Sequence, residues 1–248
     1  MISIKSEKEI DAMRESCHIV RETLRFVERH LHAGMSTKDV DQLVYDYIKS
    51  CGAIPSCLGY EGYPASACVS VNEVVVHGIP SEDQILKNGD LVSVDLCVLK
   101  NGWQGDGART FIVGEGSEED KKLVEVTRQC FFEAIDGLKA GSPLYDIGYR
   151  VQSYAESHGF GVVRSFTGHG IGREMHEDPS VPNFGKKGTG MRLKAGMVIC
   201  IEPMITAGDW RVVTLNDGWT SVTRDHSKAA HYENTIVIRE DGVEILTV

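Results

Sequence analysis

The chain matches itself at a constant offset of 107 residues, and this internal repeat limits the folds open to it. Residues 33–52 align with residues 140–159 without a gap. The identities are Ala33, Gly34, Asp39, Val44, Tyr47, Ser50 and Gly52 with Ala140, Gly141, Asp146, Val151, Tyr154, Ser157 and Gly159. The same offset aligns Leu86-Lys87-x-Gly89 with Leu193-Lys194-x-Gly196. A chance run of identities is the alternative, and one offset across two separate segments disfavours it. Two copies are too few for a solenoid, so the repeat predicts two related halves.

Each half begins with two helical patterns. Ser6 and Glu9 form a capping box, and apolar residues then recur at three- and four-residue spacing up to Leu31. Serine and glycine residues delimit the other helices in the same way, as N-caps and C-terminal stops. The predicted helices span residues 6–31, 36–52, 117–139 and 142–159.

A β-rich run follows the Leu-Lys-x-Gly turn of each half, at residues 91–98 and 198–205. Each run has a returning partner, at 108–113 and 235–238, which indicates antiparallel pairing. The sequence therefore predicts an α+β fold with a pseudo-twofold axis, an antiparallel sheet and two helix pairs. No linker-like stretch separates the halves, so we expect a single domain over 1–248, built from about 6–115 and 116–248.

Composition and charge narrow the classes of protein that this chain can belong to. The N-terminus lacks the apolar stretch of a signal peptide, and no run is long enough to span a membrane. Seven scattered cysteines without a CxxC pair favour free thiols in a reducing compartment, so we expect a cytoplasmic protein. A net charge of −10 disfavours nucleic-acid binding as the main role.

Four acidic residues stand within or beside apolar strands. The repeat places Asp95 on Glu202, while Asp106 and Glu233 precede the returning strands. If the four meet at the shared axis, each pair about 4 Å apart repels by roughly 4 kcal/mol at an effective dielectric near 20. Several such pairs would match the stability of a whole domain. Protonation or an Arg partner explains one buried carboxylate, but divalent cations explain four better. Oxygen-rich ligation suits Mn, Fe(II), Co or Zn.

Two histidine segments offer further ligands and catalytic groups. His169 and His176 lie in the glycine-rich stretch 168–176, whose glycines allow close backbone approach to a ligand. The spacing is not HExxH, which excludes a helical zinc-protease site. His77 ends an apolar strand at a turn, a usual place for functional side chains. A structural role remains the alternative for each histidine.

These residues resemble methionine aminopeptidase, type I, in its short bacterial-type form. The resemblance covers essentially the whole chain with its motifs in family order, and the family has a duplicated "pita-bread" fold. The matching stretches are Cys57-Leu58-Gly59-Tyr60, Asn72-Glu73-Val74-Val75-Val76-His77-Gly78-Ile79-Pro80, Gly168-His169-Gly170-Ile171-Gly172, Ile201-Glu202-Pro203-Met204, Asp217-Gly218-Trp219 and Tyr232-Glu233-Asn234-Thr235.

The resemblance implies a centre of two divalent ions that activates a water for hydrolysis. Asp95 would chelate one ion, and His169 with Glu202 the other, while Asp106 and Glu233 would bridge both. The catalytic residues would be His77, His176 and Glu202. In these roles, His176 would hydrogen-bond the developing oxyanion, His77 would contact the scissile amide, and Glu202 would shuttle the proton of the water.

The resemblance also implies a pocket for a methionine side chain, where aromatic rings and thiols suit a thioether. Its residues would be Cys57, Tyr60, Tyr63, Cys68, His77, Met175, His176 and Trp219. Two positions depart from common family residues: Glu61 stands where some relatives have His, and Met175 stands where Phe is frequent. A monovalent cation near Asn72 is a further implication.

The expected activity is removal of the initiator methionine from nascent proteins whose second residue is small. The partners would be the N-termini of nascent polypeptides, either at the ribosome or after release. The protein would be a monomer, and it would have no direct role in binding nucleic acid or membranes. Three alternatives remain. They are a proline-directed peptidase of the same fold, a non-catalytic module on that fold, and an unrelated two-metal phosphoesterase.

Overall fold

A computed structural model describes residues 2–248, in which four helices flank one large sheet. The helices are α1 (Glu7–His30), α2 (Thr37–Ser50), α3 (Glu118–Ile135) and α4 (Tyr145–Ser157), with a short 3-10 turn η1 (Tyr60–Gly62). The strands are β1 (Ile54–Pro55), β2 (Cys68–Val71), β3 (Val74–Val76), β4 (Leu91–Lys100), β5 (Trp103–Ile112), β6 (Gly161–Val162), β7 (Gly168–Gly170), β8 (Glu177–Val181), β9 (Val198–Ile201), β10 (Met204–Thr206), β11 (Val212–Thr214), β12 (Ser221–Thr223), β13 (Ala229–His231), β14 (Glu233–Ile238) and β15 (Val243–Ile245).

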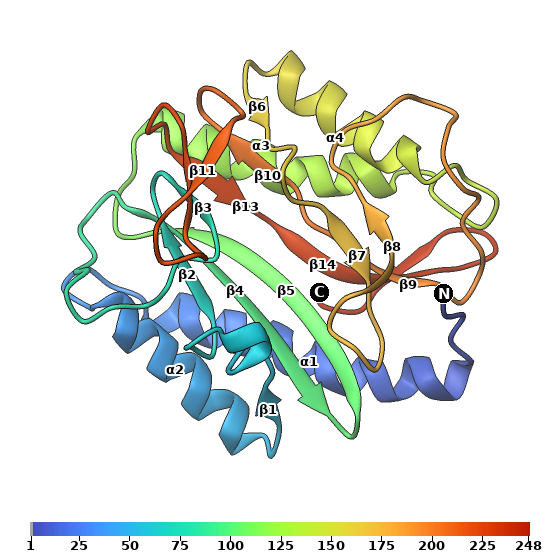
Figure 1. The fold of residues 1–248 in the computed structure, drawn as a ribbon, viewed down its shortest axis with the longest axis horizontal. Helices are drawn as coiled ribbons and strands as arrows, with labels where there is room; N and C mark the ends of the chain where they lie inside the picture. Colours follow the sequence, from blue (N-terminus) through green and yellow to red (C-terminus); the bar gives the residue numbers. More distant parts are fainter. Residues whose placement is uncertain (1) are drawn as a thin grey trace.

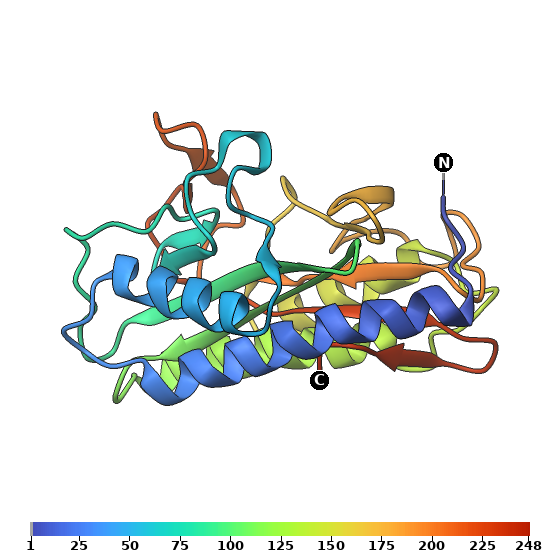
Figure 2. The same ribbon diagram turned by 90° about the horizontal axis from the view of Figure 1, so that it is seen from below.

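The large sheet has nine strands, and its main path runs β1-β4-β5-β14-β9-β7-β8 with every pairing antiparallel. In Figure 1 the α3–α4 pair lies toward the top of the view and the α1–α2 pair toward the bottom. Figure 2 shows α1 on one face of the sheet, while η1 and the β11–β12 hairpin rise from the other. The predicted α+β class, with an antiparallel sheet and two helix pairs, is confirmed.

The internal repeat is preserved in the backbone hydrogen bonds. Gly34 donates to the carbonyl of Leu86 at 2.9 Å, and Gly141 donates to that of Leu193 at 2.8 Å. Both residues of the second pair lie 107 positions after their counterparts. The isolated bridge between residues 36 and 85 has the same counterpart between residues 143 and 192. In both halves, the segment before the second helix is therefore hydrogen-bonded to an equivalent backbone segment.

The predicted strand over 198–205 is wrong, because it is broken in the middle. β9 ends at Ile201, and β10 starts at Met204 in a different three-stranded sheet. Pro203 lacks the N–H that a ladder needs, and it restricts the residue before it, so pairing stops here. Glu202 thus lies in an irregular segment rather than within a strand. The reverse holds for Asp106. The sequence predicts that it precedes a strand, but β5 begins at Trp103 and contains it.

The hydrophobic core lies between the sheet and the helices. One group of buried residues packs under α1 and α2, and a second packs under α3 and α4 around Phe131. α1 approaches β5 so closely that a Cβ on Gly105 would lie 2.7 Å from the amide nitrogen of Cys17. With the helices on one face, the other face of the sheet is left for side chains that do not pack in the core.

One sheet contains strands from both halves, joined where β5 pairs with β14. This supports the proposal that residues 1–248 form a single domain. Within the described residues 2–248, no helix has the length and apolar character needed to cross a membrane.

Candidate metal centre and substrate pocket

Asp95 and Asp106 project from the face of the sheet opposite the helices. The neighbours of Asp95 along β4 are buried against α1 and α2. Because side chains alternate along a strand, Asp95 points to the other face. Asp106 stands opposite Cys97 in the β4–β5 register, and Cys97 is two residues from Asp95 on the same face. The two carboxylates therefore share one surface.

The second half contributes Glu233 and Glu202. Glu233 is the first residue of β14 and stands opposite Ala108, two residues along β5 from Asp106. The Thr235 hydroxyl donates to the carbonyl of Asp106 at 2.8 Å and accepts from its amide at 3.1 Å. This bridge fixes the seam between the halves beside the carboxylates. Glu202 reaches the same place from the break between β9 and β10.

His169 comes from β7, where glycines permit close packing of neighbouring strands. A Cβ on Gly170 would lie 2.1 Å from the carbonyl oxygen of Asp178. Nδ1 of His169 lies 2.9 Å from the carbonyl oxygen of Gly170, so this nitrogen carries the proton. Nε2 faces the carboxylates, 3.6 Å from Oδ2 of Asp106 and 3.7 Å from Oε1 of Glu202. The imidazole is thus oriented as a metal ligand requires, with Nδ1 held by a backbone carbonyl.

The carboxylates carry strongly perturbed proton affinities. Burial raises the pKa of Asp95, Glu202 and Glu233 well above the usual range, and the charge of Asp106 raises it further. Burial also opposes ionisation of Asp106, but the imidazole of His169 beside it lowers the pKa of Asp106 overall. Without a cation the protein thus stabilises one negative charge here and disfavours the other three.

The residues fit divalent cations. Oδ1 of Asp106 and Oε1 of Glu233 are buried and have no hydrogen-bond partner among residues 2–248. A buried carboxylate oxygen without a partner is costly, and a bound cation removes that cost. The donors are carboxylate oxygens and one imidazole nitrogen, a set suited to Mn, Fe(II), Co or Zn.

Cys200 lies close to this cluster, although the sequence pattern did not indicate it. Four potential ligand atoms lie within 4.8 Å of one another, one each from Asp106, His169, Cys200 and Glu233. Burial raises the pKa of the Cys200 thiol well above its usual range, so it remains protonated, and Sγ lies 3.6 Å from Oγ1 of Thr235. Cys200 is fully buried in an apolar cluster with Met13 and Cys17 of α1, so its side chain packs behind the carboxylates, on the helix side of the sheet. Asp95 and Glu202 lie outside this tightest group.

His176 and His77 flank the carboxylate cluster. Nδ1 of His176 lies 2.8 Å from the hydroxyl of Tyr60, and its ring meets that of His169 edge-on at 4.3 Å between centroids. The ring of His77 packs edge-on against Phe166 at 5.2 Å. Burial lowers the pKa of both His77 and His176, and a neighbouring imidazole lowers each further. Both are therefore neutral near pH 7 and available as hydrogen-bonding groups.

A cavity of about 440 Å³ opens beside these groups. It brings together every site residue that the sequence indicated: Cys57, Tyr60, Tyr63, Cys68, His77, Asp95, Asp106, His169, Met175, His176, Glu202, Trp219 and Glu233. Its apolar part is a cluster of thiols, rings and a thioether, with Tyr63 and Met175 buried in its wall. The Tyr63 ring meets Trp219 edge-on at 5.1 Å, and its hydroxyl donates to the carbonyl of Gly78 at 2.9 Å. Glu61 is exposed at the rim.

Several lining residues were not indicated by sequence. They are Val76, Cys97, Phe166, Thr167 and Met204. The alternation around Asp95 could have indicated Cys97, but nothing in the sequence distinguishes Phe166 or Met204 from core residues. His231 was also missed: its Nε2 lies 3.9 Å from Oε2 of both Glu202 and Glu233.

Comparison with known proteins gives a consistent result. The profile of metallopeptidase family M24 matches residues 11–240. The chain is 52% identical to a methionine aminopeptidase of Clostridium acetobutylicum over 248 residues, covering 100% of this chain and 99% of that protein. It is 47% identical to methionine aminopeptidase 1 of Bacillus subtilis, again covering 100% and 99%.

Solved structures agree with the sequence comparison. The methionine aminopeptidase of Rickettsia prowazekii superposes with a TM-score of 0.98 at 44% identity, covering 100% of both chains. The prolidase of Pyrococcus furiosus has a TM-score of 0.78 at 23% identity, covering 99% of this chain and 65% of that one, which shows a shared fold alone. These matches also confirm the predicted pita-bread fold. The chain belongs to metallopeptidase family M24, among its methionine aminopeptidases.

Proposed function

We propose that this protein removes the N-terminal methionine from polypeptides whose second residue is small. The observation that carries the proposal is one cavity that joins a buried four-carboxylate cluster to a pocket of thiols, rings and a thioether. The carboxylates suit hydrolytic metal ions, and the pocket suits an unbranched thioether side chain. The names of the relatives support the same activity.

In this proposal Asp95 would hold one divalent ion, and His169 with Glu202 would hold the other, while Asp106 and Glu233 would serve both. When bound, such ions supply an activated water and polarise the scissile carbonyl. Mn, Fe(II), Co and Zn all suit these ligands. The buried carboxylate oxygens without partners on Asp106 and Glu233 support the bridging assignment.

The remaining polar residues act on the substrate. His176 is oriented by its contact with the Tyr60 hydroxyl at 2.8 Å, and its other nitrogen is free to donate to the carbonyl oxygen as negative charge develops. His77 stands across the cavity, where it hydrogen-bonds the scissile amide. Glu202 borders the cluster and accepts and returns the proton of the water.

The restriction to a small second residue follows from what surrounds His77. Phe166 packs on the His77 ring, and buried Met204 lines the same cavity. A substrate amide held at His77 therefore places its next side chain against these two residues. Large side chains would clash there, because a packed wall yields little.

The setting of the activity is part of the proposal. Nascent chains are the natural substrates, met at the ribosome or after release, and the protein acts as a monomer in the cytoplasm. The seven free cysteines support a reducing compartment.

A monovalent cation near Asn72 remains a prediction of the family resemblance. The φ angle is 54° at this residue, and its carbonyl accepts a hydrogen bond from the amide of Ala229 at 2.8 Å.

A peptide assay tests the proposal directly. Metal-reconstituted protein is incubated separately with Met-Ala-Ser, Met-Lys-Ser and Ala-Pro-Ala, and the released amino acids are quantified. We expect rapid release of methionine from Met-Ala-Ser and little product from the other two. Cleavage of Ala-Pro-Ala alone would show a proline-directed peptidase, and no cleavage with any of the four metals would contradict the proposal.

A further inference from the structure

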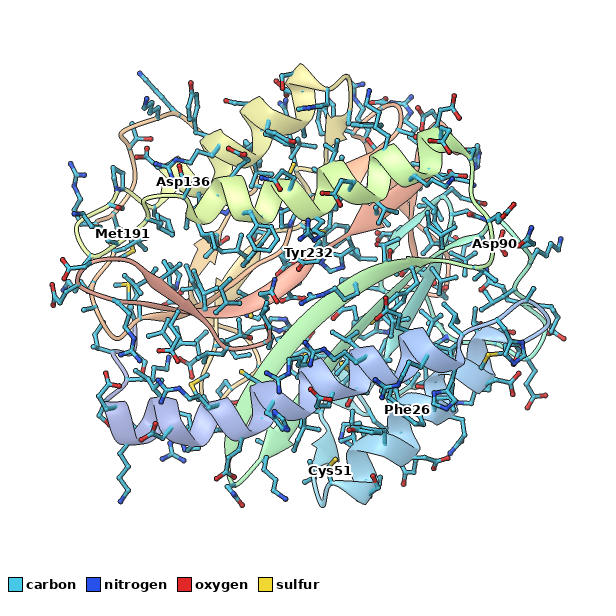
Figure 3. All side chains as sticks on the ribbon, turned by 180° about the vertical axis from the view of Figure 1, so that it is seen from behind. Phe26, Cys51, Asp90, Asp136, Met191 and Tyr232 are labelled. Atoms are coloured by element: carbon cyan, nitrogen blue, oxygen red, sulfur yellow. The ribbon has the colours of Figure 1, made fainter. Side chains whose placement is uncertain are left out.

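A second cavity lies on the opposite face of the sheet, behind the carboxylate cluster. It has a volume of about 330 Å³ and is lined by residues of α1, β5, α3 and the C-terminal segment. Figure 3 shows Tyr232, one of its lining residues, between α3 and α1. Its described lining contains four arginines, Arg21, Arg25, Arg109 and Arg128, and a single acidic side chain, Glu28.

Arg109 is the innermost of these arginines. Its guanidinium stacks on the Tyr232 ring at 4.1 Å from the centroid. It donates to the carbonyl of Glu233 at 2.6 Å and to Oδ1 of Asn234 at 2.7 Å, which are neutral acceptors. Within residues 2–248, Arg109 forms no ion pair with an acidic side chain. Its direct partners are thus neutral, and its charge is compensated only by more distant groups such as the Glu233 carboxylate.

The neighbouring arginines increase this positive charge. Burial lowers the pKa of Arg109, Tyr232 and Glu233 oppose this, and the charges of Arg128 and Arg25 lower it further, so the three arginines act on one another as like charges. Proteins seldom gather like charges around a concavity unless an ion of opposite sign occupies it.

Arg25 and Arg128 project from opposite walls, α1 and α3, with side chains 53% and 47% exposed. Each pairs with a glutamate on its own helix, Glu22 or Glu125, at 3.1 Å. Exposed ion pairs of this kind contribute little to stability, so both guanidiniums are free to turn toward a ligand. Arg21 lies one helical turn before Arg25; it pairs with Glu22 at 2.9 Å and donates to the terminal backbone oxygen of Val248 at 3.0 Å.

We propose that this arginine pocket binds a compact anion of the phosphate class. The planar guanidinium fork matches the oxygens of phosphate, and several forks converge here on one concavity. A volume of about 330 Å³ has room for phosphate or diphosphate together with bound water. A chain with a net charge of −10 does not attract a long nucleic acid, which favours a small ligand. The pocket is separate from the peptide cavity and does not depend on the peptidase assignment.

The test is calorimetric titration of the metal-loaded protein with inorganic phosphate and, separately, inorganic diphosphate. The pocket variant is Arg25→Gln/Arg128→Gln, whose positions are exposed enough to leave folding intact. The matched control is Arg192→Gln/Arg224→Gln, which removes the same charge from exposed positions outside the pocket. Circular dichroism establishes that all proteins are folded. A single-stranded RNA oligonucleotide is titrated in parallel.

We expect both anions to bind the starting protein and the control equally, and to bind the pocket variant about tenfold or more weakly. Absence of anion binding to the starting protein would overturn the proposal. Equal binding to the pocket variant would also overturn it, because the anion would then lie elsewhere, such as at the metal ions. RNA binding that the pocket variant loses, without binding of either small anion, would overturn the assignment to a compact ligand.

Discussion

Nε2 of His169 lies 3.6 Å from Oδ2 of Asp106, too far for a hydrogen bond and well placed for a shared cation. Metal–nitrogen and metal–oxygen bonds of about 2.1 Å at tetrahedral or octahedral angles put two ligands about 3 to 3.4 Å apart. The two side chains come from different halves of the chain, on β7 and β5. The observed separation therefore supports a metal centre assembled across the repeat.

Replacing Asp106 by Asn should remove metal binding and turnover together. The change keeps the size of the side chain but removes the central charge that the other carboxylates surround. Loss of a supporting partner alone weakens metal sites by about 10- to 100-fold, so loss of this ligand should exceed a hundredfold. Metal content after dialysis and methionine release provide the two readouts. Asp46→Asn, at an exposed site on α2, is the control, and an Asp106→Asn variant that retained both ions would refute the assignment.

Metal loading should release protons. Because burial raises the pKa of Asp95, Glu202 and Glu233, the metal-free protein holds protons there that cations displace. Metal affinity should therefore rise with pH. Titration calorimetry in buffers of different ionisation enthalpy measures the released protons, and heats that are identical in all buffers would contradict the raised pKa values.

The same groups set the sign of the stability change in the metal-free protein. Above the ordinary glutamate pKa, the folded state holds more protons than the unfolded state, so the free energy of unfolding falls as pH rises. The metal-loaded protein should not share this loss, because its carboxylates are already ionised. Denaturant unfolding of both forms at several pH values measures the difference.

His231 should strengthen metal binding by donating a hydrogen bond to a ligand carboxylate, without being a metal ligand itself. Its Nε2 is buried, has no hydrogen-bond partner among residues 2–248, and lies 3.9 Å from carboxylate oxygens of Glu202 and Glu233. Burial lowers the pKa of His231 to about 3, so it is neutral and can donate to either carboxylate once the site is loaded. We expect His231→Leu to weaken metal binding by about 10- to 100-fold and His231→Gln to retain most of it. Competition with a chelator measures both, and equal effects of the two substitutions would argue for simple packing.

Shortening Phe166 should relax the requirement for a small second residue. Its ring packs on His77 at 5.2 Å between centroids, beside the place where the substrate's second side chain would lie. Phe166→Ala should raise kcat/KM for Met-Val-Ser or Met-Leu-Ser relative to Met-Ala-Ser by about tenfold, the scale of a few methylenes in a pocket. Phe26→Ala, on α1, controls for a general loss of aromatic packing. An unchanged ratio would place the selective contact elsewhere.

Gly105 should be needed for the packing of α1 on β5. A Cβ there would lie 2.7 Å from the amide nitrogen of Cys17 and 2.9 Å from the carbonyl carbon of Ser16, which are backbone atoms that cannot move aside cheaply. Gly105→Ala should lower the free energy of unfolding by about 1 to 3 kcal/mol. Gly242→Ala, where no atom lies within 4 Å of the added Cβ, should be close to neutral in the same denaturant titration. Equal stabilities would disprove the close contact.

The repeat was the part of the fold most accessible from sequence. One offset aligned the helices and turns, and it placed Asp95 and Glu202 at equivalent points, because a duplicated backbone keeps its cap and turn residues. The break at Pro203 was missed, since the apolar run continues through it and periodicity does not register a lost N–H. The start of β5 was missed because Gly105 and Gly107 carry no alternation signal.

At the site, sequence indicated the residues whose types are unusual in a strand and missed those whose types are ordinary. A carboxylate among valines is conspicuous, whereas Phe166 and Met204 look like core residues until the chain brings them beside His77. Arg109 shows the converse. It lies three residues after Asp106 in β5, and side chains an odd number of positions apart on a strand point to opposite faces, so the guanidinium lies on the far face with Tyr232.

The central claim is that five side chains from both halves hold two metal ions. Anomalous diffraction from crystals of the Mn²⁺-loaded protein tests it most directly. We predict two peaks, one contacted by Asp95 and the other by His169 and Glu202, with Asp106 and Glu233 touching both. A peak bonded to the Cys200 sulfur, or peaks away from these five residues, would contradict the account.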